Sequence, residues 1–167
     1  PFSNSTSYAI PDNSTTGVNS PINVTGVLPA TIGAGSIASV CLNINHTWVE
    51  DLDIFLRCPD GTLLELSTDN GGGGDNYTST CFTPIATNTI GSAGNNTPPF
   101  TGNYAPEVNF STLNGCTANG TWQLFVRDDA ALISGSITGW SITFNNTYPP
   151  FVWSPTTAMT GANTLTP

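Results

Sequence analysis

Short stretches of alternating apolar and polar residues are the feature that most restricts the fold of this chain. In residues 36–45 the apolar side chains of Val40, Leu42 and Ile44 fall on one face. The same two-residue period recurs in residues 52–58, 121–127 and 135–144. Helical periodicity is almost absent. Because successive side chains of a β-strand point to opposite faces, the alternation predicts strands that each bury one face.

Segments rich in glycine and proline separate these stretches. Pro59-Asp-Gly61 predicts a turn in which glycine takes a positive φ, and residues 62–66 follow as the next strand. Residues 69–108 hold a run of four glycines and a Pro-Pro pair, and predict a long irregular connection. The pattern indicates one all-β domain, an antiparallel jelly-roll-like β-sandwich with long Gly/Pro-rich connections.

Composition excludes several classes of function. Only 8% of the residues are charged, the net charge is −9, and Arg57 and Arg127 are the only basic residues. Two cations cannot form the basic patch that binds nucleic acid, and they give no attraction to anionic lipid. No apolar stretch is long enough to cross a bilayer, so we expect no membrane insertion. Low charge with abundant Thr, Ser, Asn and Gly indicates an extracellular protein.

The four cysteines predict two disulfides formed in an oxidising compartment, and the absence of a CxxC pair disfavours zinc. Three connectivities are possible. The strand parity turns Cys41 outward and Cys58 inward, which disfavours a direct bridge between these two. We therefore favour the pairs Cys58–Cys81 and Cys41–Cys116.

Asn-X-Ser/Thr motifs are frequent in the chain and indicate a surface that carries glycans. There are nine: Asn4, Asn13, Asn23, Asn45, Asn76, Asn95, Asn109, Asn119 and Asn145. Asparagine and threonine are also ordinary residues of turns and strands. The frequency of these motifs is therefore explained either by glycosylation or by strand and turn composition.

Residues 145–167 carry more apolar material than a solvated linker does. The predicted assembly residues in this tail are Tyr148, Phe151, Val152, Trp153 and Leu165. Such a segment needs a surface to pack on, which is either its own domain or a neighbouring subunit. Because the chain starts at Pro1 without a methionine or a signal peptide, we expect a processed chain or a piece of a longer one.

Several short motifs, in a fixed order, resemble the P-domain of proprotein convertases and its relatives in bacterial secreted and surface proteins. These motifs are Ile10-Pro-Asp12, residues 46–54, Pro59-Asp-Gly-Thr62, residues 100–106, residues 119–124, Val126-Arg-Asp128 and residues 139–144. The resemblance covers residues 10–144, which leaves residues 1–9 as an N-terminal extension and residues 145–167 as a tail. It implies a jelly-roll sandwich, secretion and, in many bacterial members, bound calcium.

Aspartates gather where a hard cation would be held by oxygen ligands. Asp51 and Asp53 are alternate residues, so an extended chain would point both carboxylates to one side. Asp69 and Asp75 flank the glycine run, and Asp128 matches an aspartate of the P-domain relatives. We predict a calcium site from these residues, and the alternative is that Asp51, Asp60 and Asp128 form ordinary Asx turns.

No motif predicts catalysis. His46 is the only histidine, and no GxSxG sequence accompanies it as a nucleophile. The resemblance places His46 at a strand end, in a structural hydrogen-bonding role. The glutamates Glu50, Glu65 and Glu107 have no spacing that selects a glycosidase pair. We predict that the chain is not an enzyme.

Two functions fit these observations. The main hypothesis is a structural module, a subunit of a glycosylated extracellular fibre or surface layer whose tail joins it head-to-tail to the next copy, giving a homo-oligomer or filament. The alternative is a calcium-dependent adhesion or accessory domain of a larger secreted surface protein or protease.

Overall fold

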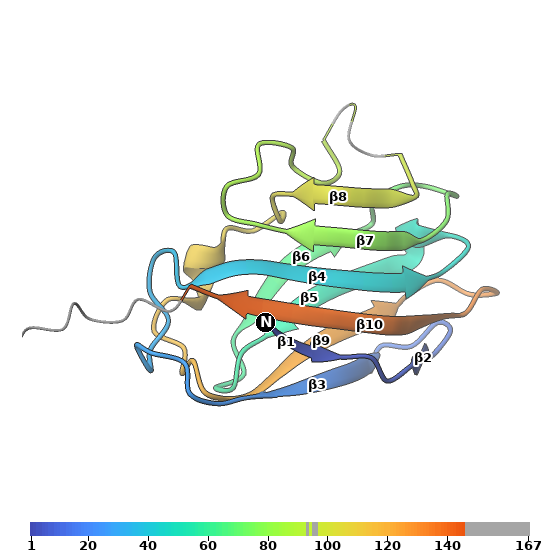
Figure 1. Ribbon diagram of the computed structural model, residues 1–167. Helices are drawn as coiled ribbons and strands as arrows, with labels where there is room; N and C mark the ends of the chain where they lie inside the picture. The colour runs from blue at the N-terminus through green and yellow to red at the C-terminus, as the bar shows by residue number, and fades with distance from the viewer. Residues whose placement is uncertain (93, 95–96, 146–167) are drawn as a thin grey trace, which may run out of the picture.

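The computed structural model describes residues 1–92, 94 and 97–145, which form two β-sheets packed face to face (Figure 1). The six-stranded sheet contains β1 (Phe2–Asn4), β2 (Tyr8–Ile10), β4 (Ile37–Asn45), β7 (Tyr77–Phe82), β8 (Phe100–Tyr104) and β10 (Gly135–Phe144). The four-stranded sheet contains β3 (Val18–Val24), β5 (Leu52–Arg57), β6 (Leu63–Thr68) and β9 (Gly120–Asp128). Two 3₁₀ turns, η1 (Val49–Asp51) and η2 (Phe110–Leu113), lie in the connections.

The strand order is β1-β10-β4-β7-β8 in one sheet, where β2 also pairs with β10, and β3-β9-β5-β6 in the other. Every described pair of strands is antiparallel except β7 and β8, which run parallel. The prediction of an all-β sandwich is therefore confirmed. The jelly-roll path stays a prediction.

The core lies between the two sheets and is built by the inward faces that the alternation predicts. Val40, Leu42 and Ile44 of β4 are completely buried, and so are the apolar residues Leu52, Ile54 and Leu56 of β5. In β10 the register shifts between Ile137 and Gly139, which keeps the inward face continuous across the glycine. Burial of these side chains is the main stabilising contribution to the fold.

Residues 1–9, expected to be an extension, belong to the sandwich. Phe2 lies opposite Ile142 in the pairing of β1 with β10, and its ring meets that of Phe144 edge to face at 6.0 Å. Strands of three residues are too short to show a periodicity, so no sequence pattern predicted them. The connection of residues 69–108 likewise contains two unpredicted strands, β7 and β8.

The four cysteines form two disulfides, as predicted, but the predicted pairing is wrong. Cys41 bridges Cys81, which lies directly opposite it where β4 pairs with β7, and Cys58 bridges Cys116. Cys41 and Cys81 are both half-buried on the outer face, whereas Cys58 and Cys116 are both buried. Cys41 and Cys58 do lie on opposite faces, as predicted, but the face of Cys81 could not be predicted because β7 itself was not.

None of the helices in the described part of the chain is long and apolar enough to span a membrane. The predicted assembly residues and one glycosylation site lie outside the described residues: Tyr148, Phe151, Val152, Trp153, Leu165 and Asn95.

Candidate functional site

Three carboxylates meet where β5 begins and its two neighbours end. Asp53 is the second residue of β5, and it lies opposite Thr68 of β6 on one side and Arg127 of β9 on the other. Because both neighbours run antiparallel to β5, the residues that follow them return to its start. As a result, carboxylate oxygens of Asp53, Asp69 and Asp129 all lie within 4.8 Å of one another. We call these three residues the aspartate cluster.

The backbone around the aspartate cluster is held by hydrogen bonds between distant segments. The Asp129 N–H donates to the Asp51 carbonyl oxygen (3.1 Å), which fixes the end of β9 against η1. The Val49 N–H donates to the Gly74 carbonyl oxygen (3.0 Å), so the glycine loop packs behind η1. Gly71 has a φ of +92° and no room for a Cβ atom, which would lie 2.6 Å from a Val49 methyl group.

The aspartate cluster carries more negative charge than its surroundings neutralise. The Arg127 guanidinium donates to Asp53, while Asp69 and Asp129 have no described ion pair. Burial raises the pKa of Asp69, and the neighbouring charges of Asp53 and Asp129 raise it further. Burial likewise raises the pKa of Asp51, with a further contribution from Asp128. A bound cation would relieve this repulsion.

The geometry of the aspartate cluster fits a calcium ion. Calcium binds oxygen ligands at about 2.3–2.6 Å, so two ligand oxygens on opposite sides of one ion are roughly 5 Å apart. The separation of at most 4.8 Å between the three carboxylates falls within that span. All three side chains are hard oxygen donors, and together they offer six oxygens to an ion that takes six to eight.

The structure brings together only part of the predicted ligand set. Asp53 and Asp69 lie in the aspartate cluster, and Asp129, which the predicted set lacked, completes it. Asp51 lies outside it because residues 49–51 form a 3₁₀ turn and not an extended strand, so the alternation assumed for residues 51 and 53 does not hold. Asp75 is exposed on the glycine loop and also lies outside the cluster.

Asp128, another predicted ligand, lies in the interior and outside the aspartate cluster. It is completely buried and accepts a hydrogen bond from His46 Nε2 at 3.1 Å, while its other oxygen accepts the Ala130 N–H at 3.2 Å. His46 Nδ1 lies 2.8 Å from the Trp48 carbonyl oxygen. The side chains of His46 and Asp128 have no exposed surface, so this pair links β9 to the end of β4 and is closed to a substrate.

A second group of potential ligands, Cys58, Asp60 and Cys116, does not form a metal site. Both cysteines are joined in one disulfide, so neither offers a thiolate. Only Asp60 remains, and its carboxylate accepts the Thr62 N–H (3.1 Å) in the turn after β5. This carboxylate is thus an Asx-turn residue, as the alternative reading of the aspartates expected.

At some predicted glycosylation sites the asparagine side-chain amide forms hydrogen bonds to the backbone of another segment. Asn119 accepts the Val27 N–H through Oδ1 (2.8 Å) and donates through Nδ2 to the Val27 carbonyl oxygen (2.9 Å). Asn4 donates through Nδ2 to the Pro21 carbonyl oxygen (2.8 Å). Asn13, Asn23 and Asn45 are exposed. Glycosylation stays a prediction, and these exposed asparagines are its best acceptors.

The raised pKa of Asp69 gives a pH-dependent prediction for the metal-free protein. Its folded-state pKa lies above the ordinary value of 3.8, so the folded state binds protons more readily than the unfolded state does. Ionised Asp69 therefore destabilises the fold at neutral pH, and this cost disappears as the pH falls toward about 4. In EDTA, Asp69→Asn is expected to melt above wild type at neutral pH, and the difference should vanish at low pH. A difference that is constant with pH would contradict the argument.

Comparison with known proteins places the chain in a family. The family model described as proprotein convertase P-domain matches residues 36–144, more than half of the chain. A curated relative, leupeptin-inactivating enzyme 1 of Streptomyces exfoliatus, is 35% identical over 143 residues, which cover 86% of this chain and 26% of the relative.

Two solved structures support the same fold. A serine protease of Aeromonas sobria matches with a TM-score of 0.54 and 19% identity, over 86% of this chain and 26% of that protein. A complex of the Aeromonas sobria serine protease and a chaperone matches with the same TM-score of 0.54. The chain thus spans about a quarter of the length of these relatives. On the family match, the chain belongs to the proprotein convertase P-domain family.

Proposed function

We propose that this chain is a non-catalytic accessory domain of a larger secreted protein, that it binds calcium at the aspartate cluster, and that it packs on a neighbouring domain. One observation carries the proposal: the match covers 86% of this chain but only 26% of a curated relative whose name describes an enzyme. A domain that corresponds to about one quarter of such a protein is expected to function next to other domains of the same polypeptide.

The buried His46–Asp128 pair supports the non-catalytic part of the proposal. A general base must come within hydrogen-bond reach of a substrate proton. Both side chains are fully buried, and His46 is the only histidine of the chain. The carboxylates of the aspartate cluster share one small volume, which suits a single ion better than a glycosidic bond held between two carboxyl groups.

The outer face of the four-stranded sheet has the composition of an interface. Phe55 of β5 and Phe125 of β9 lie opposite each other with stacked rings whose centroids are 6.0 Å apart. Arg57 lies over the Phe125 ring at 4.7 Å, and Arg127 lies over the Phe55 ring at 5.8 Å. Aromatic residues and arginine are enriched at protein interfaces. Both basic residues of a chain with net charge −9 lie on this face.

Two disulfides support the secreted location, because such bonds persist in oxidising compartments. They tie β4 to β7 and the end of β5 to the segment after η2, so they protect both sheets against local opening. The comparisons support this accessory role better than a fibre subunit, which was the main hypothesis from the sequence. Polymer formation by the isolated chain stays a separate prediction.

The proposal is tested by intact-mass analysis of the native polypeptide. We expect a mass well above the 17.4 kDa of this chain. In that native polypeptide, Arg57→Glu should lower the melting temperature of the neighbouring domain, whereas Leu132→Glu, at a side chain that is 93% exposed, should not. A native polypeptide of about the size of this chain that grows into polymers would overturn the accessory role and favour the fibre.

A further inference from the structure

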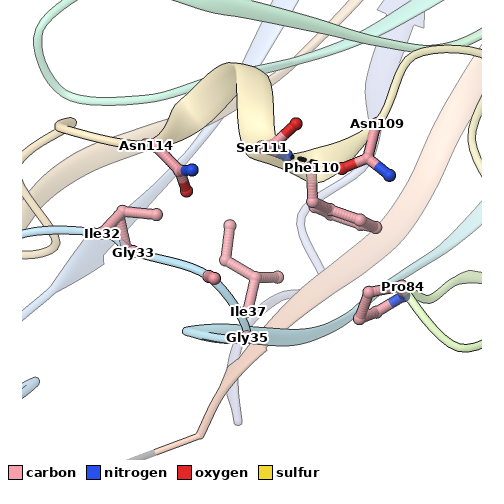
Figure 2. A pocket seen from close by; sticks show the side chains of 10 residues that line it. Ile32, Gly33, Gly35, Ile37, Pro84, Asn109, Phe110, Ser111 and Asn114 are labelled. Carbon is pink, nitrogen blue, oxygen red and sulfur yellow. Dashed lines mark hydrogen bonds between the residues drawn. The ribbon is translucent and has the colours of Figure 1, made fainter.

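A cavity of about 120 Å³ opens at the end of the sandwich where η2 faces the segment that enters β4 (Figure 2). Ile32 and Ile37 line it on one side, and Phe110 lines it on the other. Ser111 and Asn114 add polar groups along η2. Figure 2 shows Ile37 projecting into the space between η2 and the segment that carries Gly33 and Gly35. The cavity therefore has an apolar floor and one polar side.

The described chain ends on the wall of this cavity. The Asn145 N–H donates to the Ser36 carbonyl oxygen (2.8 Å), and Asn145 Nδ2 donates to the Gly35 carbonyl oxygen (3.0 Å). The preceding residue, Phe144, pairs with Ile37 where β10 meets β4. Gly35 and Ile37 both line the cavity. The chain after Asn145 thus begins at the rim of the cavity.

The first aromatic residue after this point is within reach. Tyr148 follows Asn145 by three residues, which span at most roughly 10 Å when extended. A cavity slightly smaller than the roughly 150 Å³ that holds a benzene ring suits one aromatic side chain. Tyrosine has an apolar ring and a polar hydroxyl, and this matches the apolar floor and the polar side. Pro149 and Pro150 lack N–H groups, so the segment leaves few backbone donors without partners when it packs on a surface.

We propose that residues 148–153 of the same chain dock over this cavity, with the Tyr148 ring inserted beside Ile32, Ile37 and Phe110. We call this docked segment the strap. Residues of the same chain are favoured over a second copy because Asn145 is hydrogen-bonded to the cavity wall. The short tether that begins there gives residues 148–153 a high effective concentration at the cavity. The inference does not depend on the accessory role.

Hydrogen exchange tests the strap in the complete 167-residue chain. The Ile32 N–H donates to the Cys116 carbonyl oxygen and the Gly115 N–H to the Ile32 carbonyl oxygen, both at 2.8 Å, so these amides report on the cavity wall. A variant with Tyr148→Ser, Phe151→Ser and Trp153→Ser should exchange them on the order of 10-fold faster. Amides in β9 should keep their rates in this variant. The matched control, Met159→Ser with Leu165→Ser, removes apolar side chains farther along the tail and should leave every rate unchanged.

A second pair of variants fills the cavity without altering the tail. Ala34 lines the cavity and is exposed, so Ala34→Trp should occupy it and release Tyr148, which limited proteolysis after residue 145 would detect. Ala131→Trp is the control at an exposed site away from the cavity. Unchanged hydrogen-exchange rates of the Ile32 and Gly115 amides in the triple variant would overturn the docking proposal. If the protection of the Ile32 and Gly115 amides from exchange disappeared on dilution, the segment that covers the cavity would come from a second copy. That result would also overturn docking within one chain.

Discussion

Calcium is expected to raise the melting temperature of this protein by several degrees, and Asp69→Asn is expected to abolish that rise. A ligand at about 100 times its Kd stabilises the folded state by about 2.7 kcal/mol. For a domain of this size, 1 kcal/mol shifts the melting temperature by roughly 2–4 °C, so the expected rise is about 5–10 °C. The measurement is calorimetry of wild type and variant, each in calcium and in EDTA.

The controls of the calcium experiment separate a bound ion from a general charge effect. Asp75→Asn removes a carboxylate that is exposed and lies outside the aspartate cluster, so this variant should keep the full calcium response. In EDTA at neutral pH, Asp69→Asn should melt above wild type, because burial and neighbouring carboxylates make the Asp69 charge unfavourable, as its raised pKa indicates. An equal calcium response in wild type and Asp69→Asn would rule out the cluster as the site.

Asp128→Ala is expected to lower stability more than any other single carboxylate change, with or without calcium. The substitution leaves the His46 imidazole buried without its partner and removes the acceptor of the Ala130 N–H. Breaking a buried polar pair in this way costs about 3–5 kcal/mol, or a fall of roughly 10 °C in melting temperature. Thermal melting of the variant in calcium and in EDTA measures the effect.

Two comparisons make the Asp128 result specific. Asp128→Asn keeps an oxygen that can accept from His46 Nε2, so it should recover part of the lost stability. Asp75→Ala, at an exposed carboxylate, should change the melting temperature by less than about 2 °C. If the loss in Asp128→Ala occurred only in the presence of calcium, Asp128 would be a ligand, as the sequence first predicted, and its structural role would be refuted.

The aspartate cluster shows why ligand prediction from the sequence was partial. Two of the predicted ligands, Asp53 and Asp69, lie together in the cluster. It paired Asp53 with Asp51 because alternate residues of an extended chain share a side, and the 3₁₀ turn at residues 49–51 breaks that rule. Asp129 enters through the pairing of β5 with β9, which joins residues more than seventy positions apart. No local pattern encodes such a contact.

The disulfides likewise depend partly on local pattern and partly on strand pairing. Parity within predicted strands correctly assigned Cys41 to an outer face and Cys58 to the interior, where its exposed fraction is 1%. The partners depended on β7, whose sequence Tyr77-Thr-Ser-Thr-Cys-Phe82 has positive φ at Ser79 and a register shift opposite β4. Such an irregular strand loses the two-residue period that would have shown where Cys81 points.

The sequence by itself determined the all-β class and the inward faces of β4 and β5, because hydrophobic alternation and turn chemistry are local properties of the chain. The order of its short motifs indicated the family. Only the tertiary structure decided which cysteines meet, that Asp129 replaces Asp51 in the aspartate cluster, and that Asp128 is buried with His46. Each of these depends on which strands become neighbours and in what register. That choice is made by packing the two sheets together, and a one-residue shift in register would change every one of these contacts.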